Sequence, residues 1–137
     1  MKNRRNFLKS ALVAGGGMAL FNKNSAFAMG QNTSLPKGII YTSENPGKWA
    51  QKIAGHSPVV TVDKNSVTIT TRHSMSQKHY IVRHTLVAID GTVLGEKTFY
   101  PSDKKAISNF KVAEGHSMLY ATSFCNKHDF WVTKFKL

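Results

Sequence analysis

A cysteine and a histidine near the C-terminus have the spacing of two ligands for one metal ion. Cys125 is the only cysteine of the 137-residue chain, and His128 follows it three positions later. In a tight turn the side chains at i and i+3 leave the backbone on the same side, so a thiolate and an imidazole can reach one ion. Two ligands do not define a site, because C-x-x-H also occurs by chance. Further donors must come from elsewhere in the chain.

Three upstream histidines supply the missing donors. One lies in a Gly-His-Ser-Pro segment, and two others flank the polar segment 74–78. Imidazoles combined with a thiolate suit iron, copper and zinc better than magnesium or calcium. The sequence therefore offers five candidate ligands for one metal centre: His56, His73, His79, Cys125 and His128.

The order of these residues, H-x-P, then H-x5-H, then C-N-x-H followed shortly by Trp131, resembles the superoxide reductases, the neelaredoxin and desulfoferrodoxin family. The resemblance extends from about Tyr41 to Leu137. It implies an immunoglobulin-like β-sandwich with one mononuclear non-haem iron whose sixth position is open in the ferrous state. It also implies the ligand roles: four equatorial imidazoles from His56, His73, His79 and His128, and an axial thiolate from Cys125.

The activity that this resemblance implies is the one-electron reduction of superoxide to hydrogen peroxide. The iron would alternate between Fe2+ and Fe3+, and an external donor such as a small redox protein would reduce it again. An electron-rich thiolate opposite the open position favours electron transfer to superoxide. The chain lacks the N-terminal four-cysteine module of the two-iron members, so we expect a single iron centre.

One departure from the family pattern concerns charge beside the first ligand. Many members have Glu-Lys there, where the lysine attracts superoxide and helps to protonate the peroxide, but this chain has Ala54 and Gly55. Another cation must then supply the positive charge. The lysines nearest to the ligands in sequence are Lys52, Lys78 and Lys127. We take Lys78, which lies between two ligands, as the first candidate for a catalytic residue.

The elements that position these residues are predicted to be strands. Turn signals separate seven alternating or β-branched runs, and Asp90-Gly91 predicts a tight hairpin. No amphipathic helix of convincing length follows residue 30. About seven short strands in just over 100 residues predict an all-β fold, an immunoglobulin-like β-sandwich. The predicted strands are 59–62, 66–71, 79–90, 92–100, 106–112, 118–124 and 129–135.

The ligands are expected at one end of this sandwich. A site made from loops on a rigid pair of sheets is shallow and can be reached by a small substrate from bulk water. Two further histidines, His84 and His116, have no ligand-like spacing, and we expect them on the surface or in strands. The expected places of the ligands are the loop before residue 59 for His56, two successive strand ends for His73 and His79, and the last turn for Cys125 and His128.

Residues 1–28 resemble a twin-arginine export signal. Arg4-Arg5 precedes a mildly apolar run at 11–20, and Ala26-Phe27-Ala28 has the small-x-small form of a cleavage site. The apolar run has about half of the roughly 20 residues that a spanning helix needs. We therefore expect a periplasmic protein without stable membrane insertion after cleavage. The mature chain, 29–137, is then one domain.

Charge and composition exclude several classes of function. Five of the 19 Lys and Arg residues precede Met29, so the mature chain has 14 basic and 7 acidic residues and a net charge of +7. The lysines are scattered in sequence and not interleaved with aromatics, which is atypical of nucleic-acid binding. A positive surface raises the encounter rate with small anions such as superoxide. Hydrolysis is not expected, because no Ser-His-acid set, carboxylate pair or phosphate loop is present.

Two alternative functions use some of the same residues. A cupredoxin-like electron-transfer protein also has a late cysteine and histidine, but it needs a methionine soon afterwards, and 129–132 contain none. A non-catalytic module with structural zinc needs only four ligands, whereas five are available. A single cysteine in an exported protein has no intramolecular disulfide partner, which favours a bound metal. The sequence does not identify the external electron donor. It also leaves the oligomeric state open and is compatible with a homo-oligomer.

Overall fold

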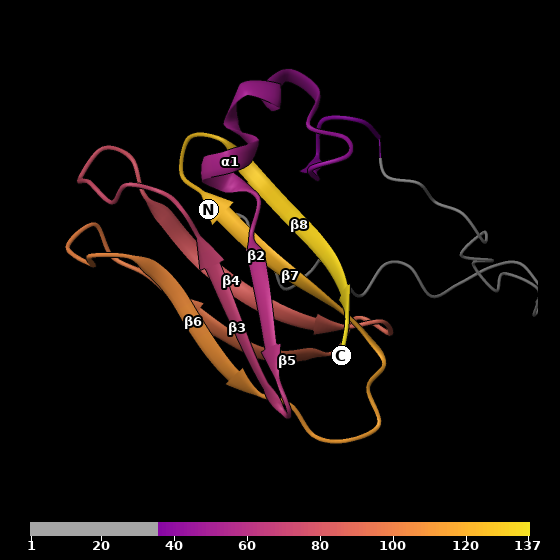
Figure 1. Ribbon diagram of the computed structural model, residues 1–137. Coiled ribbons are helices and arrows are strands. Elements are labelled where there is room, and N and C mark those ends of the chain that lie inside the picture. Colours follow the sequence, from indigo (N-terminus) through magenta and orange to yellow (C-terminus); the bar gives the residue numbers. More distant parts are fainter. Residues whose placement is uncertain (1–35) are drawn as a thin grey trace, which may run out of the picture. The chain divides into compact units, whose positions relative to one another are not determined.

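The computed structural model describes residues 36–137, and the predicted signal segment 1–28 lies outside the described residues. Eight strands and two short helical segments make up this part of the chain (Figure 1). The all-β prediction is confirmed. In chain order the elements are β1 (Ile40–Tyr41), the 3-10 helix η2 (Gly47–Lys52), α1 (Ile53–His56), β2 (Val59–Asp63), β3 (Ser66–Thr71), β4 (Ile81–Ala88), β5 (Val93–Thr98), β6 (Ala106–Lys111), β7 (Met118–Cys125) and β8 (Asp129–Lys136).

The strands form two sheets. One has the order β1-β8-β7-β4-β5 and the other has the order β2-β3-β6. The two-residue strand β1 pairs in parallel with β8, and the other pairings are antiparallel. The seven predicted strands correspond to β2–β8. Strand β1 was not predicted, since two residues are too short to show alternation.

The core lies between the sheets because the strands alternate in burial. In β3 and β7 every second side chain is buried, as expected for strands with one face on a core. Val67 and Ile69 from β3 pack in one cluster with Leu119 and Ala121 from β7. Full burial of each large aliphatic side chain is worth about 1.5–3 kcal/mol. This cluster joins the two sheets near the N-terminal end of β7.

A second core cluster occupies the opposite end of β7. It consists of Ile81, Phe99, Ala106 and Cys125, with Met75 packed against it. Met75 therefore anchors the loop between β3 and β4 on the core. The thiol of Cys125 lies at the margin of this cluster, where β7 turns into β8. Figure 1 shows α1 and η2 beside the same turn.

Two local details differ from the predictions. His56 is the last residue of the short helix α1 and does not lie in a loop. Strand β4 begins at Ile81, two residues after His79, because Ser76 and His79 first close a tight turn through two backbone hydrogen bonds of 3.0 and 3.2 Å.

The hairpin at Asp90-Gly91 is confirmed, and Gly91 has the positive φ of 89° that such turns favour. Within 36–137, no helix is sufficiently long and apolar to cross a membrane.

Candidate metal centre

The five predicted ligands converge on one point at the end of the sandwich. Each offers one donor atom, and all five donor atoms lie within 4.8 Å of one another. The donors come from three parts of the fold: α1, the connection between β3 and β4, and the end of β7 with the turn that follows it. His56 ends α1, His73 follows β3, His79 precedes β4, Cys125 ends β7 and His128 lies in the β7–β8 turn.

The distances between the donor atoms fit a single metal ion. His79 Nε2 lies 3.0 Å from His73 Nε2 and 2.9 Å from His128 Nδ1. Two imidazole nitrogens that bind one ion at right angles, with bonds of about 2.1 Å, are about 3 Å apart. Two that bind from opposite sides are about 4 Å apart. Both arrangements fall inside the observed cluster, so the residues present fit the metal that the donor set implies.

A hydrogen bond selects which nitrogen of His56 faces the cluster. His56 Nδ1 donates to the carbonyl oxygen of Lys52 at 3.0 Å, which leaves Nε2 as the free donor atom. This Nε2 is buried and has no hydrogen-bond partner. A buried nitrogen without a partner is costly unless a ligand satisfies it. His128, in contrast, presents Nδ1, because the tight turn brings its ring back over the cysteine.

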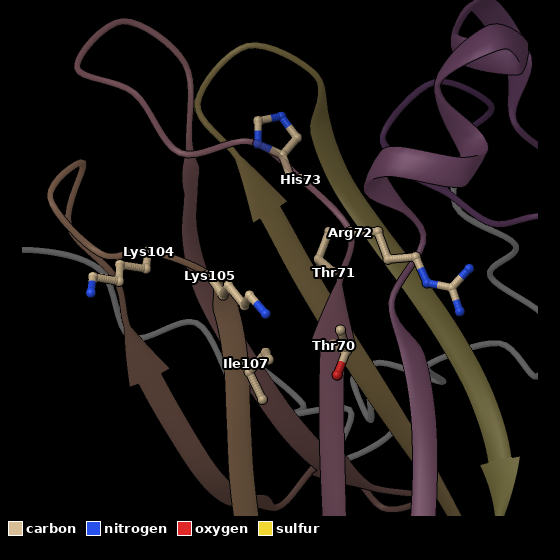
Figure 2. A pocket seen from close by; sticks show the side chains of 7 residues that line it. All are labelled: Thr70, Thr71, Arg72, His73, Lys104, Lys105 and Ile107. Carbon is tan, nitrogen blue, oxygen red and sulfur yellow. The ribbon is translucent and has the colours of Figure 1, made fainter.

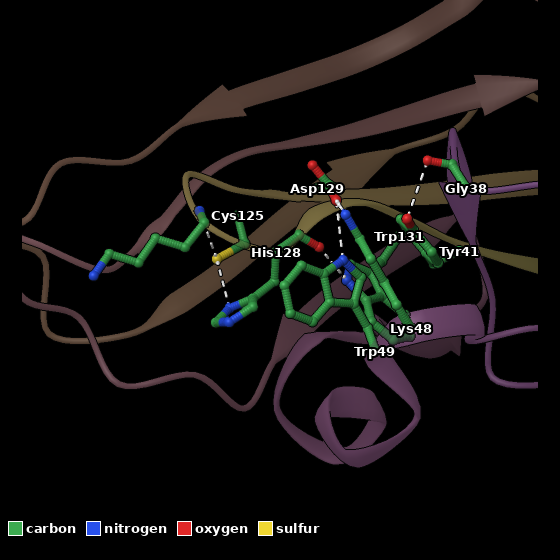
Figure 3. Close-up of polar contacts among 9 residues, drawn as sticks. Gly38, Tyr41, Lys48, Trp49, Cys125, His128, Asp129 and Trp131 are labelled. Atoms are coloured by element: carbon green, nitrogen blue, oxygen red, sulfur yellow. Dashed lines mark hydrogen bonds and ion pairs between the residues drawn. The ribbon is translucent and has the colours of Figure 1, made fainter.

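The sulfur of Cys125 lies against the imidazoles and accepts a backbone hydrogen bond. It is 3.6 Å from His128 Nδ1 and 3.9 Å from His73 Nε2, and the amide of Lys127 donates to it at 3.5 Å (Figure 3). Burial raises the pKa of the Cys125 thiol, while the amides of Lys127 and His128 counter this rise. A bound cation would therefore displace the thiol proton and stabilise the thiolate.

The imidazoles are held in the neutral form that binds metals. Burial, and secondarily the neighbouring imidazoles, lower the pKa of His56 and of His79 to about 4. Burial also lowers the pKa of His73 and of His128. At pH 7 all four rings are therefore neutral, with a lone pair available to a cation.

Two tryptophans and an aspartate hold His128 in place through hydrogen bonds and ring packing. Trp131, which is fully buried, donates from Nε1 to the carbonyl oxygen of His128 at 2.8 Å. Trp49 packs its indole edge-on against the His128 ring, with centroids 4.6 Å apart, and donates to Asp129 Oδ2 at 2.9 Å. Lys48 lies 3.5 Å from the same carboxylate. Figure 3 shows these contacts linking η2 to the ligand turn.

Asn126 ties the cysteine turn to the segment that carries His79. Its backbone amide donates to the carbonyl oxygen of Tyr80 at 3.2 Å, and its side-chain oxygen accepts from the amide of Tyr80 at 3.1 Å. Its side-chain nitrogen donates to the carbonyl oxygen of Lys78 at 3.2 Å. Three hydrogen bonds from one residue thus fix the distance between the sulfur and the neighbouring imidazole.

The match to known proteins decides the family of the chain. The family model described as desulfoferrodoxin matches residues 47–134, which is more than half of the chain and includes all five donors. The chain belongs to the desulfoferrodoxin family. The resemblance stated from the sequence is thereby confirmed. No curated protein matches the chain.

Solved structures of superoxide reductases share the fold of this desulfoferrodoxin chain. The neelaredoxin of Ignicoccus hospitalis has a TM-score of 0.62 at 23% identity, covering 72% of this chain and 94% of that one. The one-iron superoxide reductase of Giardia intestinalis has a TM-score of 0.56 at 24% identity, covering 61% and 98%. The superoxide reductase of Treponema pallidum has a TM-score of 0.51 at 26% identity, covering 58% and 66%. All three are named as oxidoreductases of one type.

The two residues directly before the first candidate ligand carry no charge. They are Ala54 and Gly55, which lie in α1 before His56. After burial and the neighbouring imidazoles, the charges of Lys127 and Lys52 also lower the pKa of His79. The same two lysines lower the pKa of His128, after burial. Both ammonium groups therefore disfavour the protonated forms of these two imidazoles.

Lys78, the catalytic residue that we predicted first, has an exposed side chain, and its carbonyl oxygen holds Asn126. Its part in catalysis stays a prediction. The two other histidines lie outside the cluster. His84 is in β4, in agreement with the expectation of a surface or strand residue, and its side chain is fully buried. His116 is half-buried in the loop before β7.

A basic groove opens next to the metal centre, on the side of His73 (Figure 2). Its cavity of about 420 Å3 lies between the end of β3 and the start of β6, and the imidazole of His73 borders both the groove and the donor cluster. Lys97, on β5, reaches the edge of the groove, where its Nζ donates to the carbonyl oxygen of Ile107 at 2.9 Å. The lining residues are Thr70, Thr71, Arg72, His73, Lys104, Lys105 and Ile107.

The cations of the basic groove have no acidic partners. In the part of the chain that the structure describes, the two ion pairs are Lys48 with Asp129 and Arg83 with Glu96. The groove cations belong to neither pair. Arg72 and the adjacent pair Lys104 and Lys105 therefore leave a positive potential beside one candidate metal ligand, His73.

Proposed function

We propose that the chain is a superoxide reductase, which adds one electron and two protons to superoxide and forms hydrogen peroxide at a mononuclear iron. The observation that supports it is the convergence of four neutral imidazoles and one thiol within 4.8 Å. Membership of the desulfoferrodoxin family and the shared fold of named superoxide reductases point to the same chemistry. Iron held by this set supplies a one-electron couple between its ferrous and ferric forms.

The protein's own residues prepare the site for that couple. The imidazoles of His56, His73, His79 and His128 hold the ion without adding negative charge, so the site stays attractive to an anion. The sulfur of Cys125 supplies electron density, and the amide of Lys127 limits how much of it is available. A six-coordinate ion held by these five donors would have one position left for the substrate.

The positive charge that draws superoxide in is proposed to come from Lys52 and Lys127, with Lys78 as a further candidate. The support is that, after burial, the charges of Lys52 and Lys127 contribute to the lowered pKa values of His79 and His128. An ammonium group near these rings would also supply a proton for the departing peroxide. These lysines would together replace the lysine that the family carries at the position of Gly55.

The external electron donor is proposed to be a small acidic redox protein that binds at the basic groove. Arg72, Lys104 and Lys105 line this groove, and His73 connects it to the donor cluster. Charge complementarity would orient the partner and raise the rate of encounter. Electron entry through His73 would leave the substrate side of the site free.

Export is proposed as the function of residues 1–28, with cleavage after Ala28 and release into the periplasm by the twin-arginine route. The support is the Arg4-Arg5 pair, the short apolar run and the small residues at the cleavage site. The test replaces both arginines by lysine and follows the mature protein in the periplasmic fraction. Continued export of the twin-lysine variant, or an intact N-terminus on the periplasmic protein, would contradict this proposal.

The main experiment loads the purified mature protein with Fe2+ in the absence of oxygen and mixes it with superoxide. Oxidation should produce one equivalent of hydrogen peroxide together with a visible thiolate-to-Fe3+ charge-transfer band. Cys125→Ser should lose the band and the reaction, whereas His116→Ala, which removes a histidine outside the cluster, should keep both. Intense blue copper absorption in the purified protein would instead support a cupredoxin-like carrier, and a colourless zinc protein would support a non-catalytic module.

A further inference from the structure

His84 is a buried histidine that the metal centre does not use. Its side chain is fully inaccessible and lies between the two sheets. Nε2 is 2.9 Å from Thr71 Oγ1, at the end of β3, and Nδ1 is 2.9 Å from Ser108 Oγ, on β6. One imidazole on the five-stranded sheet thus makes hydrogen bonds to two strands of the three-stranded sheet.

The hydrogen bonds continue from His84 to the strand that carries the cysteine. Thr71 Oγ1 donates to Ser123 Oγ, on β7, at 2.9 Å. We call these four residues, Thr71, His84, Ser108 and Ser123, the buried polar network. All of them are exposed by 2% or less. The network therefore connects β3 and β6 to β4 and β7 through directional bonds.

The donors and acceptors of the buried polar network can be assigned. The single hydroxyl proton of Thr71 goes to Ser123, so His84 must donate to Thr71 from Nε2. Nδ1 then accepts the hydroxyl proton of Ser108. A neutral imidazole satisfies this arrangement with both nitrogens. Burial lowers the pKa of His84 to about 4, in agreement with that neutral form.

Stability alone does not account for a polar network at this place. The clusters on either side of it are apolar, and one hydrogen bond adds only about 1 kcal/mol net once desolvation is counted. Apolar side chains of similar size would fill the same space with no loss. Directional hydrogen bonds restrict the two sheets to a single relative position, whereas apolar packing defines that position less strictly.

Two residues of the buried polar network lie close in sequence to two of the candidate metal ligands. Thr71 is two positions before His73, and the amide of His73 donates to the carbonyl oxygen of Thr71 at 2.8 Å. Ser123 is two positions before Cys125 and points to the same face of β7. The bond between Thr71 and Ser123 therefore joins the two strand ends from which the imidazole and the sulfur extend.

We infer that His84 is a positioning residue that fixes the offset between the two sheets, so that Cys125 and His73 meet on one metal ion. The two ligands belong to different sheets, and the distance of 3.9 Å between Sγ and Nε2 depends on how these sheets are placed. The inference rests on the proposed function, because it takes the five donors to be the ligand set. It adds a role for a residue that has no contact with the donors.

The test compares three variants of the mature protein, with Co2+ as the probe metal. His84→Leu removes both hydrogen bonds at similar size, and His84→Gln retains one donor and one acceptor. Leu119→Ala is the control, since Leu119 is equally buried but lies at the far end of β7. The readouts are Co2+ affinity and the energy of the thiolate-to-Co2+ charge-transfer band, which loss of stability alone does not move.

We expect His84→Leu to bind Co2+ at least about tenfold more weakly and to shift the band, the range known for residues that orient metal ligands. His84→Gln should restore part of the Co2+ affinity and part of the band position. Leu119→Ala should lower the melting temperature and leave the affinity and the band unchanged. Equal band and affinity in His84→Leu and the unmodified protein would overturn the inference, as would an equal shift in Leu119→Ala. If His84→Leu does not fold, Thr71→Val and Ser108→Ala make the same comparison.

This design separates two failures. Absence of a thiolate band in the unmodified protein would refute the proposed ligand set itself. Presence of the band there, unchanged in the variants of the buried polar network, would refute only the role of His84.

Discussion

Three of the five candidate ligands are oriented by a hydrogen bond outside the cluster. The carbonyl oxygen of Lys52 holds His56, Trp131 holds the backbone of His128, and the amide of Lys127 reaches the sulfur. Such partners fix ring orientation and tautomer before a metal arrives.

Removal of the charge of Lys52 should slow the reaction with superoxide. In Lys52→Ala the second-order rate constant should fall about threefold to tenfold at low ionic strength, because one attracting charge near the open side is lost. The rate is measured by rapid mixing of the Fe2+ protein with superoxide at increasing salt. Lys78→Ala, tested beside it, decides which lysine matters more.

The control for both lysine variants is Lys136→Ala, an exposed lysine near the far end of β8. Its rate constant should equal that of the unmodified protein. Equal rates and equal salt dependence in Lys52→Ala and Lys136→Ala would remove Lys52 from the mechanism.

Acid should destabilise the metal-free protein partly through His84. Burial lowers its pKa from 6.5 to about 4, so the unfolded chain binds the additional proton between these pH values. The stability that neutral His84 contributes is thus complete above pH 6.5 and is lost as the pH falls toward 4. Between pH 7 and pH 5 the loss should be about 2 kcal/mol larger than in His84→Gln.

Urea denaturation of both metal-free proteins at the two pH values measures this difference. The other histidines are common to both proteins, so their titration cancels in the comparison. The same pH dependence in His84→Gln as in the unmodified protein would show that His84 does not titrate as its burial requires.

At the scale of elements, the short segments η2 and α1 depend on the turn between β7 and β8. Trp49 from η2 donates to Asp129, and Asp129 itself has a left-handed φ of 63°. Asp and Asn tolerate this conformation better than most residues with a Cβ. One side chain therefore shapes the ligand turn and also holds the segment that brings His56 to the cluster.

Asp129→Ala should lower the free energy of unfolding by about 1–3 kcal/mol, because it loses the acceptor for Trp49 and strains the turn. Asp129→Asn keeps an acceptor oxygen and tolerates the left-handed backbone, so its loss should be smaller. Urea denaturation gives the free energies, and hydrogen exchange at residues 47–56 shows whether η2 and α1 open more often. Unchanged exchange in Asp129→Ala would contradict this link.

For the whole molecule, charge is distributed over two places that have separate tasks in our proposal. Lys52 and Lys127 act on the open side of the metal centre, while Arg72, Lys104 and Lys105 line the basic groove beside His73. A protein donor at the groove and a small anion at the open side can then approach independently. A change in the groove charges should therefore affect re-reduction of the iron and not its reaction with superoxide.

Reversal of the groove charges should slow re-reduction and leave the reaction with superoxide unchanged. In the double variant Lys104→Glu and Lys105→Glu, reduction of the Fe3+ protein by a reduced acidic ferredoxin should be about tenfold slower at low salt. The difference should shrink at high salt, because ions screen the attraction. Stopped-flow absorbance of the charge-transfer band records both half-reactions.

The matched control reverses two exposed lysines of β8, Lys134→Glu and Lys136→Glu. It changes the net charge by the same amount at another place. Equal slowing in both double variants would show that net charge, and not the groove, controls the donor reaction.

The sequence by itself determined the class of fold and the five candidate donors. Strands such as 66–71 and 118–125 show the period of two that burial of one face imposes, so the all-β class could be predicted. The ligands could be selected because C-N-x-H and H-x5-H are short-range patterns within single turns and loops. Residues such as His84 have no such pattern, and their surroundings could not be predicted.

Only the tertiary structure decided which distant residues meet. Pairing of Thr71 with Ala106 places Arg72, at the end of β3, and the adjacent Lys104 and Lys105, before β6, on the lining of one groove, although more than 30 positions separate them in the sequence. Packing of one sheet on the other places His84 against Thr71 and Ser108. The physical reason is that register and sheet packing depend on contacts between residues far apart in the chain, whereas the patterns read from sequence are set by neighbours within a few positions.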